Sequence, residues 1–362
     1  MRFFSIGLLC VLCLLSCKTK QQTTTSAIAN FNLKFIGEQV IKDNLMYKNN
    51  LVGGLSSLDY ANGKYYAICD DKDTIRFYTL KLDFEDGSFK RCTILDATNI
   101  IINEKVDPEG LRYEARNNSI YWTSEGSIRN NISPSIFKMD TLGNILQKVP
   151  TPKMFRAENG LRNNGTFEGI SLSKDADFLW IGMELPLKQD GDEPKLIDGK
   201  YPVRVSKINK KTGDIAFQFA YMLDKIPKDS KPSGKFRVNG SPEILSIDET
   251  HFLVLERAYA SGYENGGNTV KIYAVDCSKA TNIAKIDSLL QTEFIPAKKT
   301  LIFDFESIRS KLTNGIVDNI EGITFGPTLA NGNRTLLVVS DDNFRKFSKQ
   351  ITQIIAFEVV EN

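Results

Sequence analysis

The sequence predicts an all-β protein, a β-propeller built from four-stranded blades. A motif in which Glu-Gly or its equivalent opens a short apolar strand, and an acid closes the following strand, recurs along the chain. A second hairpin with alternating apolar residues follows each copy, so one copy and its hairpin make four strands. Apart from a weak candidate at residues 307–312, no segment has the 3.6-residue period of an amphipathic helix.

The first residues have the features of an export signal, and we expect residues 1–16 to be a lipoprotein signal peptide. Arg2 precedes an apolar run that is too short to span a membrane, and Leu14-Leu15-Ser16-Cys17 looks like a bacterial lipobox, in which Cys17 would carry the lipid. The alternative, an ordinary secretory signal, also places the protein outside the cytoplasm. We expect attachment to the cell envelope, at the outer membrane facing the periplasm, because no acidic cluster follows Cys17.

Residues 17–30 are polar and lack periodicity, which predicts a flexible tether before a domain that spans residues 31–362. Successive copies of the motif lie 56, 59, 75 and 78 residues apart, a spacing that suits blades with loops of variable length. The copies are VGGLSSLDY…YYAICDD (52–71), DPEGLRY…IYWTSEG (107–126), TFEGISLS…FLWIGMEL (166–185), SPEILSID…FLVLERA (241–258) and NIEGITFG…LLVVSDD (319–342).

Five copies predict five blades, and six remain possible if the stretch 258–318 hides a degenerate blade. The last copy is followed by one clear strand, residues 351–360, whereas residues 31–41 form an extra strand at the start of the domain. We therefore expect the N-terminal strand to complete the final blade, which would leave no exposed sheet edge at the seam.

Composition excludes some classes of function. The chain has 46 Lys and Arg against 44 Asp and Glu, which gives no electrostatic footprint for nucleic acid. The domain contains three cysteines, Cys69, Cys92 and Cys277; one pair could form a disulfide, but single cysteines on apolar strands are typically small buried hydrophobes.

The acids of the motif predict a carboxylate-lined mouth of the central channel. The first strand of a hairpin starts at the end where the second strand finishes, so the opening and closing acids of the innermost hairpins would gather there. Carboxylate oxygens in this number suit Ca²⁺ better than Zn²⁺. The candidate metal ligands are Asp70, Glu109, Glu125, Glu168, Glu184, Glu243, Glu256, Glu321 and Asp341. Alternatively, the opening acids accept hydrogen bonds from the neighbouring blade, and the glycine after each only permits close packing.

Basic residues near these acids are candidates for binding an anionic substrate, either alongside calcium or as salt-bridge partners. They are Lys72, Arg112, Arg204, Arg257 and Arg345. Glu168 and Glu243 are the candidates for the general base, because both of their copies combine an opening acid, a clear second-strand acid and a long following loop.

Taken together, GGLSSLDY, AICDD, DPEGLRY, WTSEG, FEGIS, PVRV, GSPEIL and FLVLER resemble the phytase-like (esterase-like activity of phytase) family over about residues 52–343. The resemblance implies a propeller and suggests hydrolysis of phosphoesters or esters of a small-molecule or phosphorylated substrate. Motifs of other hydrolases are lacking, with no GxSxG, HExxH or P-loop, and His251 is expected in a turn away from the acids. The rival hypothesis is a non-catalytic envelope propeller that binds a glycan, peptide or protein.

Overall fold

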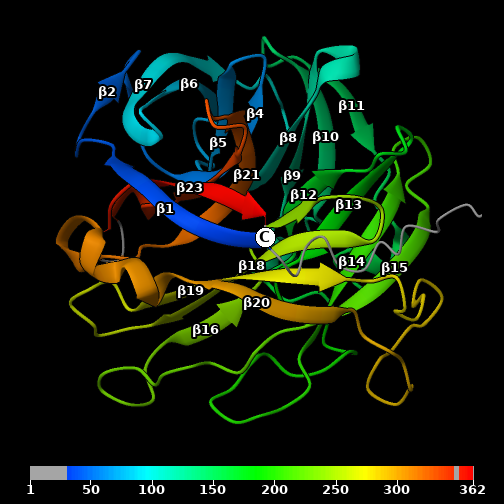
Figure 1. Ribbon diagram of the computed structural model, residues 1–362. Coiled ribbons are helices and arrows are strands. Elements are labelled where there is room, and N and C mark those ends of the chain that lie inside the picture. Colours follow the sequence, from blue (N-terminus) through cyan, green and yellow to red (C-terminus); the bar gives the residue numbers. More distant parts are fainter. Residues whose placement is uncertain (1–30, 346–349, 362) are drawn as a thin grey trace, which may run out of the picture.

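The computed structural model describes residues 31–345 and 350–361. In this part of the chain, five four-stranded blades surround a central axis (Figure 1), so the predicted five-bladed, all-β propeller is confirmed. The segment 258–318 contributes strands to the fourth blade and forms no sixth blade. The expected signal peptide, tether and lipidation site at Cys17 lie outside the described residues.

Each of the first three blades is a short antiparallel meander in which the strands follow one another in chain order. Blade one consists of β4 (Leu55–Ala61), β5 (Lys64–Cys69), β6 (Arg76–Glu85) and β7 (Ser88–Asn99). Blade two consists of β8 (Pro108–Glu114), β9 (Ser119–Ser124), β10 (Ser135–Asp140) and β11 (Ile145–Val149). Blade three consists of β12 (Phe167–Leu172), β13 (Phe178–Met183), β14 (Pro202–Asn209) and β15 (Ile215–Met222).

The last two blades depart from this pattern. Blade four consists of β17 (Ile244–Ser246), β18 (His251–Ala260), β19 (Asn268–Asp276) and β20 (Lys298–Asp304), and β16 (Arg237–Gly240) pairs with the far half of β18. Blade five consists of β21 (Ile320–Thr328), β22 (Arg334–Ser340), β23 (Gln353–Glu361) and β1 (Phe31–Val40). A small hairpin of β2 (Met46–Tyr47) and β3 (Asn50–Leu51) connects β1 to blade one.

The N-terminal strand closes the ring, as the sequence predicted. β1 pairs with β23 along its length, from Phe31 opposite Glu361 to Val40 opposite Gln353. Figure 1 shows β1 in blue beside β23 in red. Because β22 pairs antiparallel with β23, residue 340 and residue 353 lie at one end of the blade, and Phe31 lies at the opposite end. The chain thus joins the propeller at the end remote from the closing acids.

The Glu-Gly pairs sit at bulges in the innermost strands. The pairing register shifts at the start of β4, β8, β12 and β21, whereas β17 pairs with β18 without a shift. The glycines lie against the next blade: a Cβ on Gly110 would be 2.5 Å from the carbonyl oxygen of Glu168, and one on Gly322 would be 2.8 Å from the Cα of Ser57. The glycine of the motif therefore permits close packing between inner strands.

Apolar side chains between adjacent blades form the core. Trp180 of blade three is 1% exposed and meets Phe252 of blade four edge to face at 4.9 Å between ring centroids. Trp122 of blade two stacks on Phe137 at 4.6 Å. β-branched and aromatic residues dominate these strands because both faces of the sheets pack against neighbouring blades.

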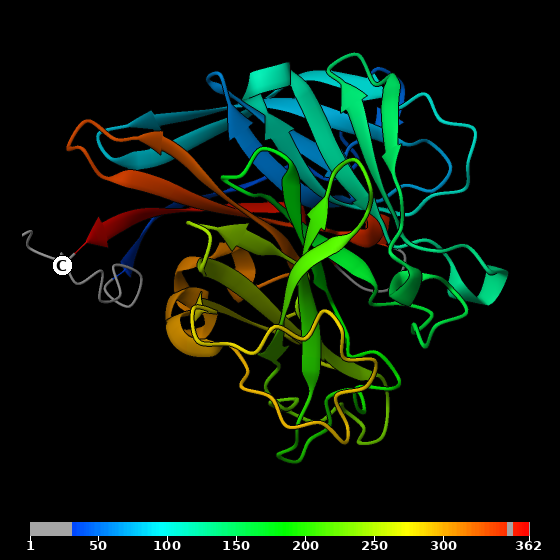
Figure 2. The same ribbon diagram turned by 90° about the vertical axis from the view of Figure 1, so that its right-hand side faces the viewer.

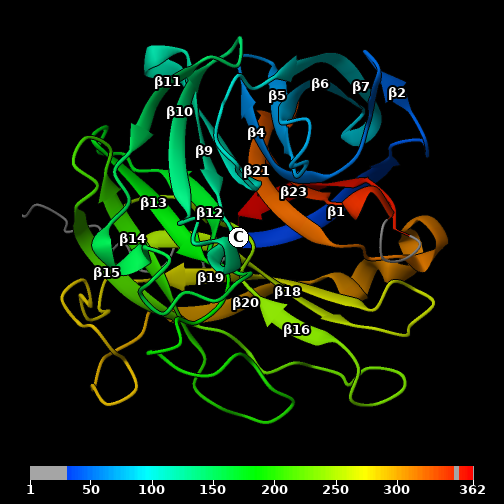
Figure 3. The same cartoon turned by 180° about the vertical axis from the view of Figure 1, so that it is seen from behind.

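Loops and short helical turns decorate the rim. Figure 2 shows the long loops of blades three and four at its lower edge, and Figure 3 shows the turns at residues 305–315 in orange beside β1. The helical candidate at residues 307–312 falls in the 3-10 helix Phe305–Lys311, which the Asp304 side chain caps at the N–H of Glu306. In the part of the chain described, no helix is long and apolar enough to cross a membrane, and Cys69, Cys92 and Cys277 are free thiols.

Candidate functional site

Eight carboxylates gather where the second strands end and the first strands begin. Glu109 and Glu168 repel each other and five further carboxylates, those of Asp70, Asp107, Glu125, Glu184 and Glu321. Asp341 in turn interacts with Glu321, so the eight form one cluster. We call this cluster the acidic mouth, and it consists of Asp70, Asp107, Glu109, Glu125, Glu168, Glu184, Glu321 and Asp341. It comes from four of the five blades, so seven of the nine candidate metal ligands named from the sequence are brought together.

Two carboxylate triads within the acidic mouth have the spacing of a metal site. Carboxylate oxygens of Asp70, Asp107 and Glu109 lie within 4.8 Å of one another, and the same holds for Glu109, Glu125 and Glu168. Glu109 belongs to both triads, so it stands between two candidate cation positions. Hard oxygen donors in such groups are the ligands that Ca²⁺ prefers.

Several of these carboxylates lack protein partners. Glu168 is 7% exposed, and within residues 31–345 and 350–361 no group donates a hydrogen bond to its carboxylate or to that of Glu109. One carboxylate oxygen of Asp70 and one of Asp107 are also buried without a partner. Buried polar atoms are normally satisfied, so oxygens left open at one place indicate a site that takes up a proton or a cation.

Burial and mutual repulsion raise the pKa values of the cluster. Burial, followed by repulsion from Asp107 and Glu184, raises the pKa of Glu125 to about 7. Burial raises the pKa of Glu321 to about 8, although Arg257 opposes the shift. The pKa of Glu168 lies well above its usual range, first through burial and then through repulsion by Glu125. Without a bound cation, part of the cluster is therefore protonated at neutral pH.

Two cations compensate part of this charge. The guanidinium of Arg257 lies 3.0 Å from a carboxylate oxygen of Glu321 and 3.2 Å from one of Glu184. Lys72 pairs with Asp107, and this hydrogen bond raises the pKa of Lys72 although burial opposes it. Arg257 and Lys72 are the two substrate-binding candidates that the structure brings to the acidic mouth.

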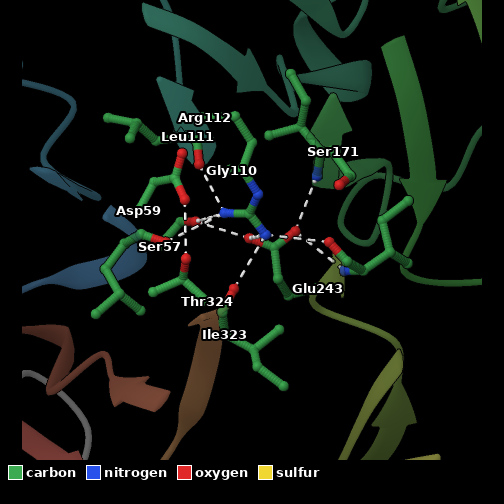
Figure 4. Close-up of polar contacts among 12 residues, drawn as sticks. Ser57, Asp59, Gly110, Leu111, Arg112, Ser171, Glu243, Ile323 and Thr324 are labelled. Carbon is green, nitrogen blue, oxygen red and sulfur yellow. Dashed lines mark hydrogen bonds and ion pairs between the residues drawn. The ribbon is translucent and has the colours of Figure 1, made fainter. Parts of the chain in front are cut away.

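Glu243 lies deeper in the channel, where its carboxylate is fully engaged (Figure 4). One oxygen accepts hydrogen bonds from the N–H groups of Ile170 at 2.9 Å and Ile244 at 3.0 Å. The other accepts from the Ser57 hydroxyl at 2.7 Å and lies 3.1 Å from Nη2 of Arg112. A carboxylate with both oxygens occupied has no lone pair directed at a ligand, so this geometry does not suit the metal-binding and general-base roles considered for Glu243.

Arg112 is the partner that completes this buried network. Arg112 as a whole is 2% exposed. Its guanidinium donates hydrogen bonds to four inner-strand carbonyl groups, those of Leu58, Leu111, Ile244 and Ile323. With the bond from Ile170 to Glu243, the pair contacts the inner strands of all five blades. Ile170 and Ile323 lie two residues beyond Glu168 and Glu321, about 6–7 Å along each strand. The structure thus places Arg112 in a buried network below the acidic mouth, where its Nη1 and Nη2 groups contact protein oxygens.

Glu256 also lies away from the acidic mouth. Its carboxylate accepts from the Tyr221 hydroxyl and from Lys299, on the side of β18 that faces blade three. The three residues of β17 pair with β18 without a register shift, and β18 runs on past Glu256 instead of ending at the acid. Strand alternation then turns Arg257, not Glu256, toward the mouth.

The remaining basic candidates have other partners. Arg204 forms a two-pronged ion pair with Asp190 at 2.6 and 2.8 Å, and both side chains are fully buried between blade three and the segment after β19. Arg345 pairs with Asp43 at the rim. His251 forms hydrogen bonds to Asp248 in the β17–β18 turn, as expected.

Sequence reasoning missed Asp107, which belongs to one triad and pairs with Lys72. It stands two residues before Glu109 in Asp-Pro-Glu-Gly, and its N–H is held by the Ser124 hydroxyl at 2.9 Å. Comparison of the motif copies could have identified it, because this copy alone has an acid at that position. The other copies have Gly54, Thr166, Ser241 and Asn319 there.

The fold and the acidic mouth define the protein as a five-bladed β-propeller with a carboxylate cluster at one end of its channel. Within that class, the chain belongs to the phytase-like (esterase-like activity of phytase) family, whose family model matches residues 50–344. The resemblance inferred from the motifs is thereby confirmed. A comparison with curated proteins gives no match.

Solved structures with a similar fold include several glycoside hydrolases. A putative glycoside hydrolase from Bacteroides ovatus is 11% identical, with 84% of this chain and 86% of that chain covered and a TM-score of 0.42. A thermostable family-43 glycoside hydrolase is 9% identical, with coverages of 84% and 89% and a TM-score of 0.49. An α-L-arabinofuranosidase from Lactobacillus brevis is 11% identical, with coverages of 84% and 91% and a TM-score of 0.43. Likeness at this level does not bear on the reaction.

Proposed function

We propose that the protein is a calcium-dependent hydrolase of phosphoesters or carboxylic esters and that the acidic mouth is its active site. The observation that carries the proposal is the pair of triads that share Glu109, with open carboxylate oxygens on buried side chains. Family membership supports the same class of reaction. Calcium bound there would act as a Lewis acid on an ester oxygen and lower the pKa of a water molecule.

The residues of the mouth divide the work between holding the cation and moving the proton. Asp70, Asp107 and Glu109 form the triad that Lys72 partly neutralises, which makes them suitable for binding a cation together with an anionic substrate. Glu168 receives no hydrogen bond from the described residues, so its carboxylate, once a bound cation at the mouth keeps it ionised, is suited to accept the proton of the attacking water. Arg257 forms ion pairs with Glu184 and Glu321, which belong to the same mouth.

The cellular location is a second part of the proposal. We propose that a lipid on Cys17 anchors the protein to the cell envelope, facing the periplasm. β1 begins at the end of blade five opposite to the acidic mouth, so a tether ending at Phe31 would leave the mouth directed away from the membrane surface. Labelling with a radioactive fatty acid tests the anchor, since a Cys17→Ala variant would incorporate none.

The experiment that tests the function is hydrolysis of 4-nitrophenyl phosphate and 4-nitrophenyl acetate by the chain from residue 18 onward, with and without a calcium chelator. We expect turnover with calcium and its loss on chelation. If chelation lowers the melting temperature while no ester is hydrolysed under any condition, calcium has a structural role, and the non-catalytic envelope propeller is the correct account.

A further inference from the structure

A hollow of about 370 Å³ lies beside the acidic mouth, over blade two. Its walls come from the segment before β8, the end of β9, the start of β10 and the segment after β11. By the strand directions of blade two, all four places are at the end of the propeller that carries the mouth. The hollow is therefore an off-axis extension of the same face.

The lining of this hollow is basic, in contrast to the mouth. It contains three cations and one carboxylate, which leaves a net charge of +2. Lys148 is paired with the carboxylate, Glu104. Lys105 and Arg156 have no ion-pair partner within residues 31–345 and 350–361, and both are exposed. Two uncompensated cations around one concave space favour an anionic ligand.

The hollow is joined to the acidic mouth through a shared wall. Ser124 lines the hollow, and its hydroxyl accepts the N–H of Asp107 at 2.9 Å. Val106, also in the lining, directly precedes Asp107, and Glu125 directly follows Ser124. The hollow, with Lys105 and Arg156 in its lining, therefore adjoins the mouth at Asp107 and Glu125.

We propose that this hollow binds a second anionic group, a phosphate or a carboxylate, of the substrate. Its role in selecting substrates rests on the function proposed above, whereas the binding of an anion does not. The mouth itself repels anions when no cation is bound, because its carboxylates outnumber Arg257 and Lys72. Anion binding measured in the presence of a chelator therefore reports the hollow.

The test is calorimetric titration of the chain from residue 18 onward with inorganic phosphate, and in parallel with succinate, in the presence of a calcium chelator. We expect saturable binding of at least one of the two anions. The Lys105→Ala/Arg156→Ala variant should bind it about tenfold more weakly or worse, since two charge-assisted contacts are lost. Lys153→Ala, which removes an exposed cation near Arg156 outside the lining, should bind as the unaltered protein does.

Absence of binding by both anions would overturn the proposal, as would binding that persists in the double variant. Circular dichroism of the double variant checks its folding, which two exposed substitutions should leave intact. Where turnover is found, the double variant should raise KM for a bisphosphate about tenfold and leave KM for 4-nitrophenyl phosphate unchanged. If the protein hydrolyses nothing, the titrations still decide whether the anion site exists.

Discussion

At the scale of single residues, the acids of one sequence motif perform two kinds of task. Glu168 and Glu109 present carboxylates that receive no hydrogen bond from the described chain, whereas Glu243 has both oxygens bound to protein groups. Glutamate at the same motif position thus has an open carboxylate in blades two and three, is paired with Arg257 in blade five, and forms a buried ion pair with Arg112 in blade four. Glycine follows the glutamate in blades two, three and five, and isoleucine follows it in blade four.

Glu168→Gln tests the role given to the open carboxylate. The amide keeps the shape of the side chain but cannot take a proton from water, so turnover should fall by about 10² to 10⁴-fold. Glu264→Gln, an exposed change in the loop after β18, is the control and should have no effect. Steady-state kinetics with saturating calcium measure both. Unaltered turnover in Glu168→Gln would exclude Glu168 as the base.

Glu243→Ala tests the buried ion pair. Removing one partner leaves Arg112 charged and uncompensated, so the free energy of unfolding should fall by about 3–5 kcal/mol. The double change Arg112→Met/Glu243→Leu should cost less than this, because no buried charge is left alone. Denaturant unfolding measures both variants. A Glu243→Ala protein of normal stability that has lost turnover would instead return Glu243 to the active site.

At the scale of elements, the sequence predicted the strands well and their inner register less well. Alternating, β-branched and aromatic residues along segments such as 203–208 and 215–221 indicate strands, and these strands are present. Bulges are different, because a bulge depends on contact with the next blade. The motif predicts Glu256 at the mouth, but β18 continues through this residue, and the side chain that reaches the mouth is that of Arg257.

Gly110→Ala tests the packing role of the motif glycine. A Cβ would stand 2.5 Å from a backbone oxygen of blade three, so the inner strands must separate, and the free energy of unfolding should fall by about 1–3 kcal/mol. Gly182→Ala is a milder comparison, since its nearest neighbour is a side-chain carbon of Ile244 at 3.2 Å. Equal stability of the two variants would show that close approach at Gly110 is not what the motif preserves.

At the scale of the whole molecule, the number of blades and the N-terminal closure followed from counting repeats and strands. Counting repeats does not predict which charged side chains pair with one another in the folded protein. Arg204 follows the long loop 186–202 in the sequence and was a substrate-binding candidate, yet it forms a buried ion pair with Asp190. Such ion pairs depend on where loops lie in the folded protein, and the sequence pattern does not predict the positions of loops.

Removal of β1 tests the closure. Without residues 31–40, β23 becomes an edge strand with free N–H and C=O groups, so the protein should aggregate. A chain that begins at residue 31 keeps all pairs of β1 with β23 and should remain monodisperse. Size-exclusion chromatography distinguishes the two. Monodisperse behaviour of the shorter chain would show that β1 is dispensable for the ring.

The raised pKa values of the mouth predict an unusual pH dependence. Carboxyl groups with pKa values raised in the folded state, such as Glu125 at about 7 and Glu321 at about 8, bind more protons when folded than when unfolded. The calcium-free protein should therefore lose stability as pH rises from about 5 to about 8. Calcium should restore it, since cation binding replaces the protons. Thermal unfolding across this range, with and without chelator, measures the effect; a flat profile would contradict the assigned charge states.

The central claim is that the acidic mouth binds calcium and that this binding supports hydrolysis. Calorimetric titration of the chain from residue 18 onward with calcium, combined with the two ester assays, tests it most directly. We expect calcium binding that is weakened in Glu109→Gln, the residue shared by both triads, and turnover that a chelator abolishes. A protein that binds no calcium and hydrolyses neither ester would contradict the account and leave the propeller as a binding scaffold.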